Sequence, residues 1–335
     1  MSFRQVLEKF TTTMGKPAIV MEQTLKELMG LRRLVLVIAA GLIPAIFFGA
    51  VVWRESFRSG AMSLEMQTHT FVGYFLIFSF IWIAGFYITY MIITSGMDFV
   101  SKEEEEGTLL LMVSKPIGRF QFIIGKFLAL LITTLLIELV VLFGSILIFW
   151  ALLGLEPESV RALVGLVFWI FLYSILIVIL FDALTIAIST LFKGKVIKTV
   201  LTMLLVMLVF GVGPILRMVW PTAYENYHLY YIDPGYHLGN TYVSISEQAI
   251  SGRMTPQSQA YLGIFTGTYK AGMEELVLAM FTGSSESFDP DIRAMPPSLE
   301  QTNYLNPLVS VLLCLVVSAA ALGGAKVAIE RREVY

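Results

Sequence analysis

Two carboxylates interrupt long apolar stretches of this 335-residue chain. Glu138 lies 12 residues after Lys126, and Asp182 lies 11 residues before Lys193. At the helical rise of about 1.5 Å per residue, each acid would lie about 17 Å inside a membrane if these stretches cross one. A carboxylate at that depth can bind a cation, exchange a proton or hydrogen-bond a polar cargo. Glu138 and Asp182 are therefore candidates for the lining of a translocation path.

A structural role explains the same two acids. Each could be protonated, or could accept a hydrogen bond from a hydroxyl such as Thr134 or Thr185, and so serve helix packing. Since the sequence places no lysine or arginine at the same depth, we expect no ion pair to either acid within one chain. A path lined by them would lie between two copies of the chain and favour a cationic or hydrogen-bonding cargo.

Catalytic motifs are not found. A P-loop requires G-x-x-x-x-G-K-[ST], because backbone amides hold the phosphates while the lysine and hydroxyl serve phosphate and Mg²⁺. The Gly-Lys pairs of this chain are followed by Pro17, Phe127 and Val196, so none fits. The single cysteine, Cys314, cannot form an intrachain disulfide. Without an H-E-x-x-H motif or a cysteine partner, we expect no metal site at the three histidines, which are His69, His228 and His237.

The composition is that of a membrane protein. Hydrophobic residues make up 57% of the chain and charged residues 14%, against about 25% charged in soluble domains, and the mean hydropathy is +0.78. A net charge of −2 predicts no nucleic-acid partner, which would need a concentrated basic face. The first thirty residues are charged and amphipathic, so we expect no cleavable signal peptide.

Six stretches are long enough to cross a membrane, which takes about 20 apolar residues each. They are residues 34–53, 71–97, 121–150, 162–192, 196–220 and 307–326. We therefore predict an all-α integral membrane protein with six transmembrane helices. Its predicted parts are 1–33 (amphipathic interfacial helices), 34–220 (spans 1–5), 221–306 (extracytoplasmic insertion) and 307–335 (span 6 and a short tail). Pro44 should kink span 1, and Gly211 to Pro214 should break span 5 before Trp220.

Two apolar patterns with helical spacing precede span 1. Their members are Phe3, Val6, Leu7 and Phe10, then Met21, Leu25, Leu28 and Met29. Both predict amphipathic helices, the second with Pro17 in its first turn. We expect the second helix to lie along the inner membrane surface. Packing against a soluble partner is the alternative.

Basic residues and tryptophans predict the orientation. With a cytoplasmic N-terminus, sixteen of the 23 lysines and arginines lie on the cytoplasmic side and seven on the other, as the positive-inside rule requires. Trp53, Trp150 and Trp220 then fall at the outer ends of spans 1, 3 and 5, where interfacial rings are common. Both termini should thus be cytoplasmic. The acidic outer insertion could be an exit gate, a docking site or a purely structural lid.

A glutamate run lies in the predicted cytoplasmic loop 98–120, between spans 2 and 3. Glu103 to Glu106 precede the apolar residues Leu109 to Val113, and acids in a first turn complement the helix dipole. This pattern predicts a short helix across the cytoplasmic surface. A solvated loop that only fixes the topology is the alternative.

The same region resembles a known family. Its residues Glu105-Glu106-Gly107-Thr108-Leu109, Lys115-Pro116-Ile117-Gly118-Arg119 and Gly125-Lys126 look like the E-x-G-T-L, P-x-x-R and G-K signature of type-2 ABC transporter permeases. Lys26-Glu27-Leu28 is similar to the family's short K-E-L entry. The insertion at 221–305 departs from the pattern by its size.

The resemblance implies a mechanism. The loop would be a coupling helix that docks on a separately encoded ATPase, with Glu105, Glu106, Gly107 and Thr108 forming or flanking the helix. Pro116 and Arg119 would form the turn that transmits its motion to span 3.

The resemblance also implies the partners. They are two ATPase subunits, which bind ATP and Mg²⁺, and a second permease copy in a homodimer within the plasma membrane. This chain itself would carry no cofactor and act in export. One rival function is an ion-coupled secondary transporter using Glu138 and Asp182, although the sequence has no internal repeat. An intramembrane enzyme or scaffold is the other.

Overall fold

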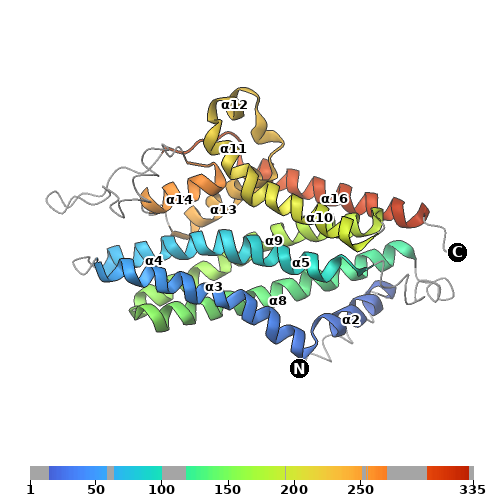
Figure 1. The fold of residues 1–335 in the computed structure, drawn as a ribbon, viewed down its shortest axis with the longest axis horizontal. Helices are drawn as coiled ribbons and strands as arrows, with labels where there is room; N and C mark the ends of the chain where they lie inside the picture. The colour runs from blue at the N-terminus through green and yellow to red at the C-terminus, as the bar shows by residue number, and fades with distance from the viewer. Residues whose placement is uncertain are drawn as a thin grey trace.

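The computed structural model describes residues 15–58, 64–99, 118–192, 194–250, 254, 256–269 and 300–331. These residues form an elongated bundle of helices (Figure 1). Six helices are long and apolar enough to cross a membrane, which confirms the predicted number of spans. They are Leu31–Val52, Phe71–Gly96, Arg119–Leu153, Pro157–Leu191, Lys195–Val219 and Pro307–Arg331.

The described chain begins with the short helix α2, and the spans that follow run along the bundle in alternating directions. The spans are built from α3 (Leu31–Arg58); α4 (Leu64–Phe78), η1 (Ser79–Tyr87) and α5 (Ile88–Gly96); α8 (Arg119–Leu153); α9 (Pro157–Leu191); α10 (Lys195–Met207), η2 (Leu208–Val212) and α11 (Gly213–Val219); and α16 (Pro307–Arg331). The remaining described helices are α2 (Lys16–Leu28), α12 (Pro221–Asn226), η3 (Leu229–Tyr231), α13 (Pro234–Ile250) and α14 (Pro256–Thr266).

The second and fourth spans form the centre of the bundle. In the most apolar window of Phe71–Gly96, 78% of residues are buried, against 22% in the windows of Leu31–Val52 and Pro307–Arg331. Helix α9 packs against α8, α5, α13 and α16. It therefore places Asp182 in the interior of the protein and not on a lipid-facing surface.

Local sequence signals explain where the helices begin and end. Gly154, with φ of 61°, ends α8, and its amide donates a hydrogen bond to the Trp150 carbonyl. Pro157 starts α9 at a position where no backbone N–H donor is needed. Asn306, just before Pro307, is a residue type typical of a helix start. Its Oδ1 accepts a hydrogen bond from the Leu308 amide at 2.9 Å and so caps α16.

Two spans contain a π-helical segment, η1 in the second and η2 in the fifth. A side-chain carbon at Gly85 would lie 2.6 Å from the Phe80 carbonyl oxygen, and one at Gly213 would lie 2.9 Å from that of Leu208. Glycine thus lets each wide turn close. The predicted break at Gly211 to Pro214 is wrong, since η2 continues directly into α11. A π turn in this segment carries the chain past Pro214 without ending the helix.

The two π segments also meet through Phe210. Its ring centroid lies 6.2 Å from that of Phe80 and 5.6 Å from that of Phe86. Helix α3 runs through Pro44, and the kink expected there stays a prediction.

Helix α2 packs against the third span. Its residues Met21 and Leu25 are buried against Ala129 of α8, while Ile19 is 57% exposed. The predicted apolar face therefore covers α8, and the position of α2 at a membrane surface stays a prediction. The other amphipathic pattern, from Phe3 to Phe10, lies outside the described residues.

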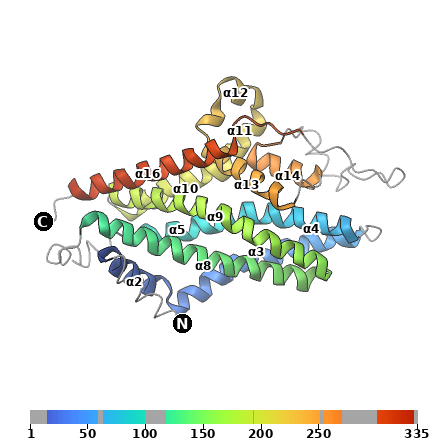
Figure 2. The same ribbon diagram turned by 180° about the vertical axis from the view of Figure 1, so that it is seen from behind.

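Much of the outer insertion is packed into the bundle. Helix α13 contacts α9 and α16, and its Tyr242 donates a hydrogen bond to the Leu76 carbonyl at 2.8 Å. Helix α12 instead projects sideways from the bundle in both views (Figures 1 and 2). The insertion is thus partly a core element, and its residues 270–299 lie outside the part that the structure describes.

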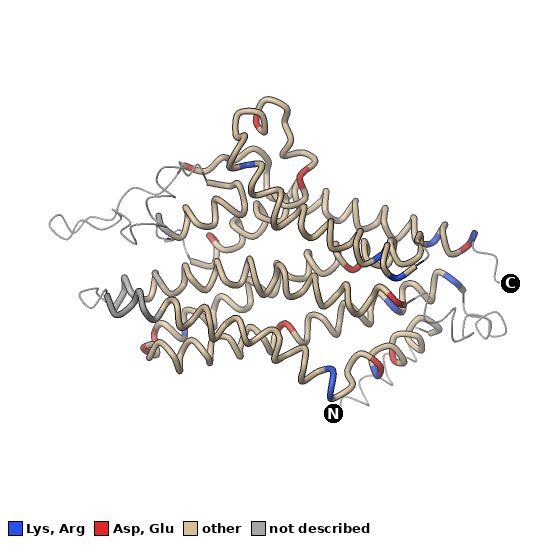
Figure 3. Tube along the Cα trace, viewed as in Figure 1, with Lys and Arg blue, Asp and Glu red and all other residues tan. Residues whose placement is uncertain are grey.

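Basic residues gather at one end of the bundle. Figure 3 shows most of the described lysines and arginines at the end that holds α2, the start of α8 and the end of α16. Lys195 pairs there with Asp98, whose carboxylate oxygen lies 2.7 Å from Nζ. This arrangement supports the predicted cytoplasmic placement of that end.

Cysteine labelling tests this orientation. Cys314, the only cysteine of the chain, is buried, so a Cys314→Ala chain gives a clean background. Lys195 begins span 5 and its side chain is 73% exposed, while Tyr227 follows the end of that span and is 76% exposed. We expect Tyr227→Cys to react with a membrane-impermeant maleimide on intact cells. Lys195→Cys should react only after lysis, and the reverse pattern would contradict the orientation.

Candidate functional site

The structure describes part of the predicted coupling region. Glu105, Glu106, Gly107, Thr108 and Pro116 lie outside the described residues, so their role in docking an ATPase stays a prediction. The described part begins at Gly118, which donates its amide to Gln121 Oε1 at 3.0 Å and so caps the start of α8.

Arg119 joins the start of span 3 to the end of span 6. Its Nη1 donates to the carbonyl oxygens of Ile329 and Glu330 at 2.9 and 3.0 Å. These carbonyls belong to the last turn of α16, where oxygens lack partners within the helix and the dipole is negative. A guanidinium satisfies both demands, so Arg119 links the start of span 3 to the end of span 6.

Gly125 allows α2 to lie directly on α8. A side-chain carbon at Gly125 would lie 2.7 Å from both the Pro17 carbonyl oxygen and Val20 Cβ. No side chain fits in that gap, so the glycine is required by the close approach of the two helices. The first residue of the Gly-Lys pair therefore ties α2 to span 3.

Lys126, the second residue of that pair, is buried with 5% of its surface exposed. Its Nζ lies 4.9 Å from the ring centroid of Phe99 and 5.4 Å from that of Phe122, distances at which a cation is attracted to an aromatic face. Phe99 follows span 2, and Phe122 belongs to span 3. Lys126 thus holds these two spans together next to the coupling region.

Glu138 is fully buried inside the protomer. Its Oε1 accepts a hydrogen bond from Ser174 Oγ of α9, and Ser174 is a residue that the sequence analysis did not single out. The signal in the sequence was weak, because a serine in an apolar run can equally bond its own helix, as Ser174 also does with the Ile170 carbonyl at 2.9 Å.

Asp182 is also fully buried. Within the described part of the chain, neither of its carboxylate oxygens has a hydrogen-bond partner, nor do the hydroxyls of Thr134 and Thr185. A hydroxyl does bond Glu138, as the structural alternative allows, but it belongs to Ser174 and not to Thr134 or Thr185. Glu138 and Asp182 pack between helices in this conformation, and their place on a translocation path stays a prediction.

A buried ion pair, which no sequence pattern indicated, fastens the end of span 5 that leads into the insertion. Arg217 Nε lies 2.9 Å from Asp233 Oδ2, with the two side chains 5% and 10% exposed. Arg217 Nη1 donates to the Phe265 carbonyl at 2.7 Å, and Tyr224 donates its hydroxyl to Asp233 Oδ2 at 2.9 Å. Burial and the Asp233 carboxylate raise the pKa of Tyr224 above its ordinary value, so the hydroxyl keeps its proton. This cluster joins α11, α12, α13 and α14.

The histidines of the insertion are held by hydrogen bonds. His237 Nε2 lies 3.0 Å from the Tyr231 carbonyl, which can only accept, so Nε2 carries the proton and Nδ1 faces Ser310 Oγ at 3.3 Å. His228 Nδ1 lies 2.7 Å from the Tyr230 hydroxyl. Among the residues that the structure describes, no three histidine, cysteine or acidic side chains form a group suited to a metal ion.

The chain was compared with known proteins. A family model described as ABC-2 family transporter protein matches residues 21–332. No protein with curated annotation matches the chain.

The close approach at Gly125 predicts the effect of enlarging it. Gly125→Ala should destabilise the protein by about 1–3 kcal/mol, the usual cost of overpacking, because the new methyl group meets backbone. Gly165→Ala is the control, since nothing lies within 4 Å of the corresponding position and alanine favours a helix by up to about 1 kcal/mol. Thermal unfolding in detergent gives the midpoint of each variant. Equal midpoints for Gly125→Ala and Gly165→Ala would contradict the α2–α8 contact.

The buried ion pair makes a second prediction. Arg217→Met leaves Asp233 buried without its cation and should cost about 3–5 kcal/mol. Lys195→Met removes a cation of the same charge from a pair whose side chains are 73% and 38% exposed, where about 0–1 kcal/mol is expected. Chemical denaturation compares the variants, and a similar loss in both would contradict the role of the Arg217–Asp233 pair.

Proposed function

Because the chain belongs to the ABC-2 family of transporter proteins, we propose that it is the transmembrane permease subunit of an ATP-driven exporter. Two copies would work with two separately encoded ATPase subunits. The match of the family model to residues 21–332 is the observation that carries this proposal. The matched residues include all six candidate spans, so the match concerns the whole membrane domain.

The energy source is assigned to the partner. Each Gly-Lys pair of this chain lacks the hydroxyl residue that a P-loop requires. ATP and Mg²⁺ would therefore bind on the ATPase subunits, and this chain would carry no cofactor.

Coupling would run through loop 98–120. The contacts of its described end support this. Arg119 bonds the end of α16, and Gly125 lies against α2. A displacement of the loop would thus move span 3, span 6 and α2 together. In this scheme Glu105, Glu106, Gly107 and Thr108 engage the ATPase, and Pro116 with Arg119 transmits the motion.

The charge distribution supports one orientation, and the family resemblance supports the plasma membrane. The basic end of the bundle (Figure 3) would face the cytoplasm, with both termini on that side, and the ATPase subunits would bind there. The membrane would be the plasma membrane, with the outer insertion on its far side.

The cargo path would form between two copies of the chain. Spans 1, 5 and 6 have the least buried windows, at 22%, 33% and 22%, so they offer apolar surface for lipid and for a second copy. Movement of the bundle would have to expose Glu138 and Asp182 for them to line such a path. The family match does not favour the alternative of an ion-coupled secondary transporter that uses these two acids.

Co-purification tests the proposal. The tagged full-length chain, extracted from its own cells in mild detergent, should bring down a P-loop ATPase at about one copy per permease, and the complex should hydrolyse ATP. Mass spectrometry identifies the partner. A preparation that is monodisperse, stable and free of any nucleotide-binding protein would contradict it.

Arg119→Glu tests the coupling step in the same complex. Spin labels at Lys26→Cys and Lys326→Cys, whose native side chains are 74% and 48% exposed, report the spacing of α2 and span 6 in the Cys314→Ala chain. ATP should change this spacing in the wild type. Arg119→Glu should abolish the change and leave basal hydrolysis, because a carboxylate cannot bond the α16 carbonyls. Arg331→Glu is the control, and an equal response in both variants would oppose the assignment.

A further inference from the structure

A small hollow lies at the basic end of the bundle, where α2 turns into α3. It is enclosed by α2, α3, α5 and α8, and its volume is ≈ 10 Å³, about what a single water-sized group needs. The hollow therefore admits one small polar atom, such as an oxygen, and no bulky cargo.

Arg33, a cation with no acidic partner among the described residues, lines this hollow. Arg33 is half-buried, and its Nη2 donates to Ser95 Oγ at 2.5 Å. Within the described part of the chain, no carboxylate pairs with Arg33, whose guanidinium carries five N–H donors. Most of its donors are thus available to a ligand.

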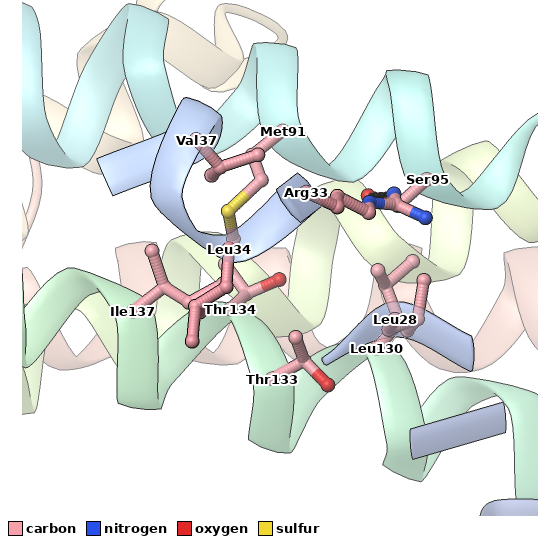
Figure 4. Close-up of a pocket in the computed structure, with 10 residues that line it drawn as sticks. All are labelled: Leu28, Arg33, Leu34, Val37, Met91, Ser95, Leu130, Thr133, Thr134 and Ile137. Carbon is pink, nitrogen blue, oxygen red and sulfur yellow. Dashed lines mark hydrogen bonds between the residues drawn. The ribbon is translucent and has the colours of Figure 1, made fainter. Parts of the chain in front are cut away.

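Two buried hydroxyls line the same hollow. Thr133 and Thr134 of α8 are 4% and 0% exposed, and neither hydroxyl has a hydrogen-bond partner among the described residues. Figure 4 shows Arg33 and Ser95 on one side of the hollow and the two threonines on the other. Buried polar groups are normally satisfied by protein, water or ligand, so these hydroxyls indicate an occupant.

The surroundings of the hollow are those of a lipid site. Leu34, Val37 and Ile137 line its wall, and no carboxylate is among its lining residues. On the outside of α3, Leu31 and Leu36 are 75% and 71% exposed, and hydrocarbon chains would cover these side chains. Arg33 lies at the end of the candidate span Leu31–Val52, which is headgroup level in a membrane, while Thr133 and Thr134 lie farther along the candidate span Arg119–Leu153.

We propose that this hollow binds the phosphate group of an anionic phospholipid of the cytoplasmic leaflet. Arg33 donates two hydrogen bonds to phosphate oxygens, a geometry for which a guanidinium is well shaped. Thr133 and Thr134 donate to the oxygen that enters deepest. A lipid whose headgroup also carries a cation binds less well. Its ammonium group is repelled by Arg33, and the hollow offers it no carboxylate. The site does not depend on the proposed transport function, since its ligand is a membrane component.

Native mass spectrometry of the full chain in detergent tests the site. The probes are phosphatidylglycerol, phosphatidylcholine and inorganic phosphate. We expect phosphatidylglycerol to bind more tightly than phosphatidylcholine, and Arg33→Gln to weaken it by about tenfold, the effect of losing a charge-assisted hydrogen bond. Arg32→Gln is the matched control, since Arg32 is exposed and does not line the hollow.

Further variants keep the outcome decisive. Arg33→Lys retains the charge and should keep part of the affinity, while Thr133→Val with Thr134→Val should weaken binding and leave Arg33 in place. Equal affinity of the Arg33→Gln and Arg32→Gln chains, or equal binding of the two lipids, would overturn the proposal. Displacement of the lipid by millimolar inorganic phosphate, dependent on Arg33, would overturn the lipid assignment and leave a free phosphate site.

Discussion

A polar group that enters hydrocarbon without a partner costs several kcal/mol, and this constraint explains the contacts between the helices. The last carbonyls of α16 are bonded by Arg119 from another span. Glu138 is bonded by Ser174 across the α8–α9 contact, and Arg217 is neutralised by Asp233. Each satisfied group also fixes the position of one helix against the next. The polar contacts therefore specify the arrangement, while apolar packing fills the space between them.

The two ends of the bundle are fastened in different ways. At the basic end, Arg119, Gly125 and Lys126 lie within eight residues of one helix and reach α16, α2 and Phe99 respectively. At the other end, one ion pair joins the short helices of the insertion. Helix α9 packs against elements along the length of the bundle. The basic end therefore links several elements directly to the start of span 3.

The six spans and the Asn306 cap could be predicted because length, hydropathy and capping chemistry are local properties of a sequence. Ser174 could not, since its partnership with Glu138 depends on which turns of α8 and α9 lie side by side. The same holds for Arg217 and Asp233, because their sequence surroundings do not distinguish them from surface charges and only the tertiary fold buries them together. The apolar pattern of α2 was visible, but periodicity alone does not say whether lipid or α8 covers that face. Residues Glu105 to Thr108 and Pro116 rest on the family resemblance alone.

The π-helical segments are the features that local rules misread, since Gly211 to Pro214 suggested a break and the chain instead widens its turn. Such a segment holds a residue in excess of the α-helical repeat. If that excess residue moves along the span, the stretch it passes rotates by about 100°, the angle that one residue takes up at 3.6 per turn. Phe210, wedged beside Phe80 and Phe86, lies where such a rotation in either span would redirect a ring. Such a movement would present a different face of a span and shift that stretch by only about 1.5 Å along its axis, the rise of one residue.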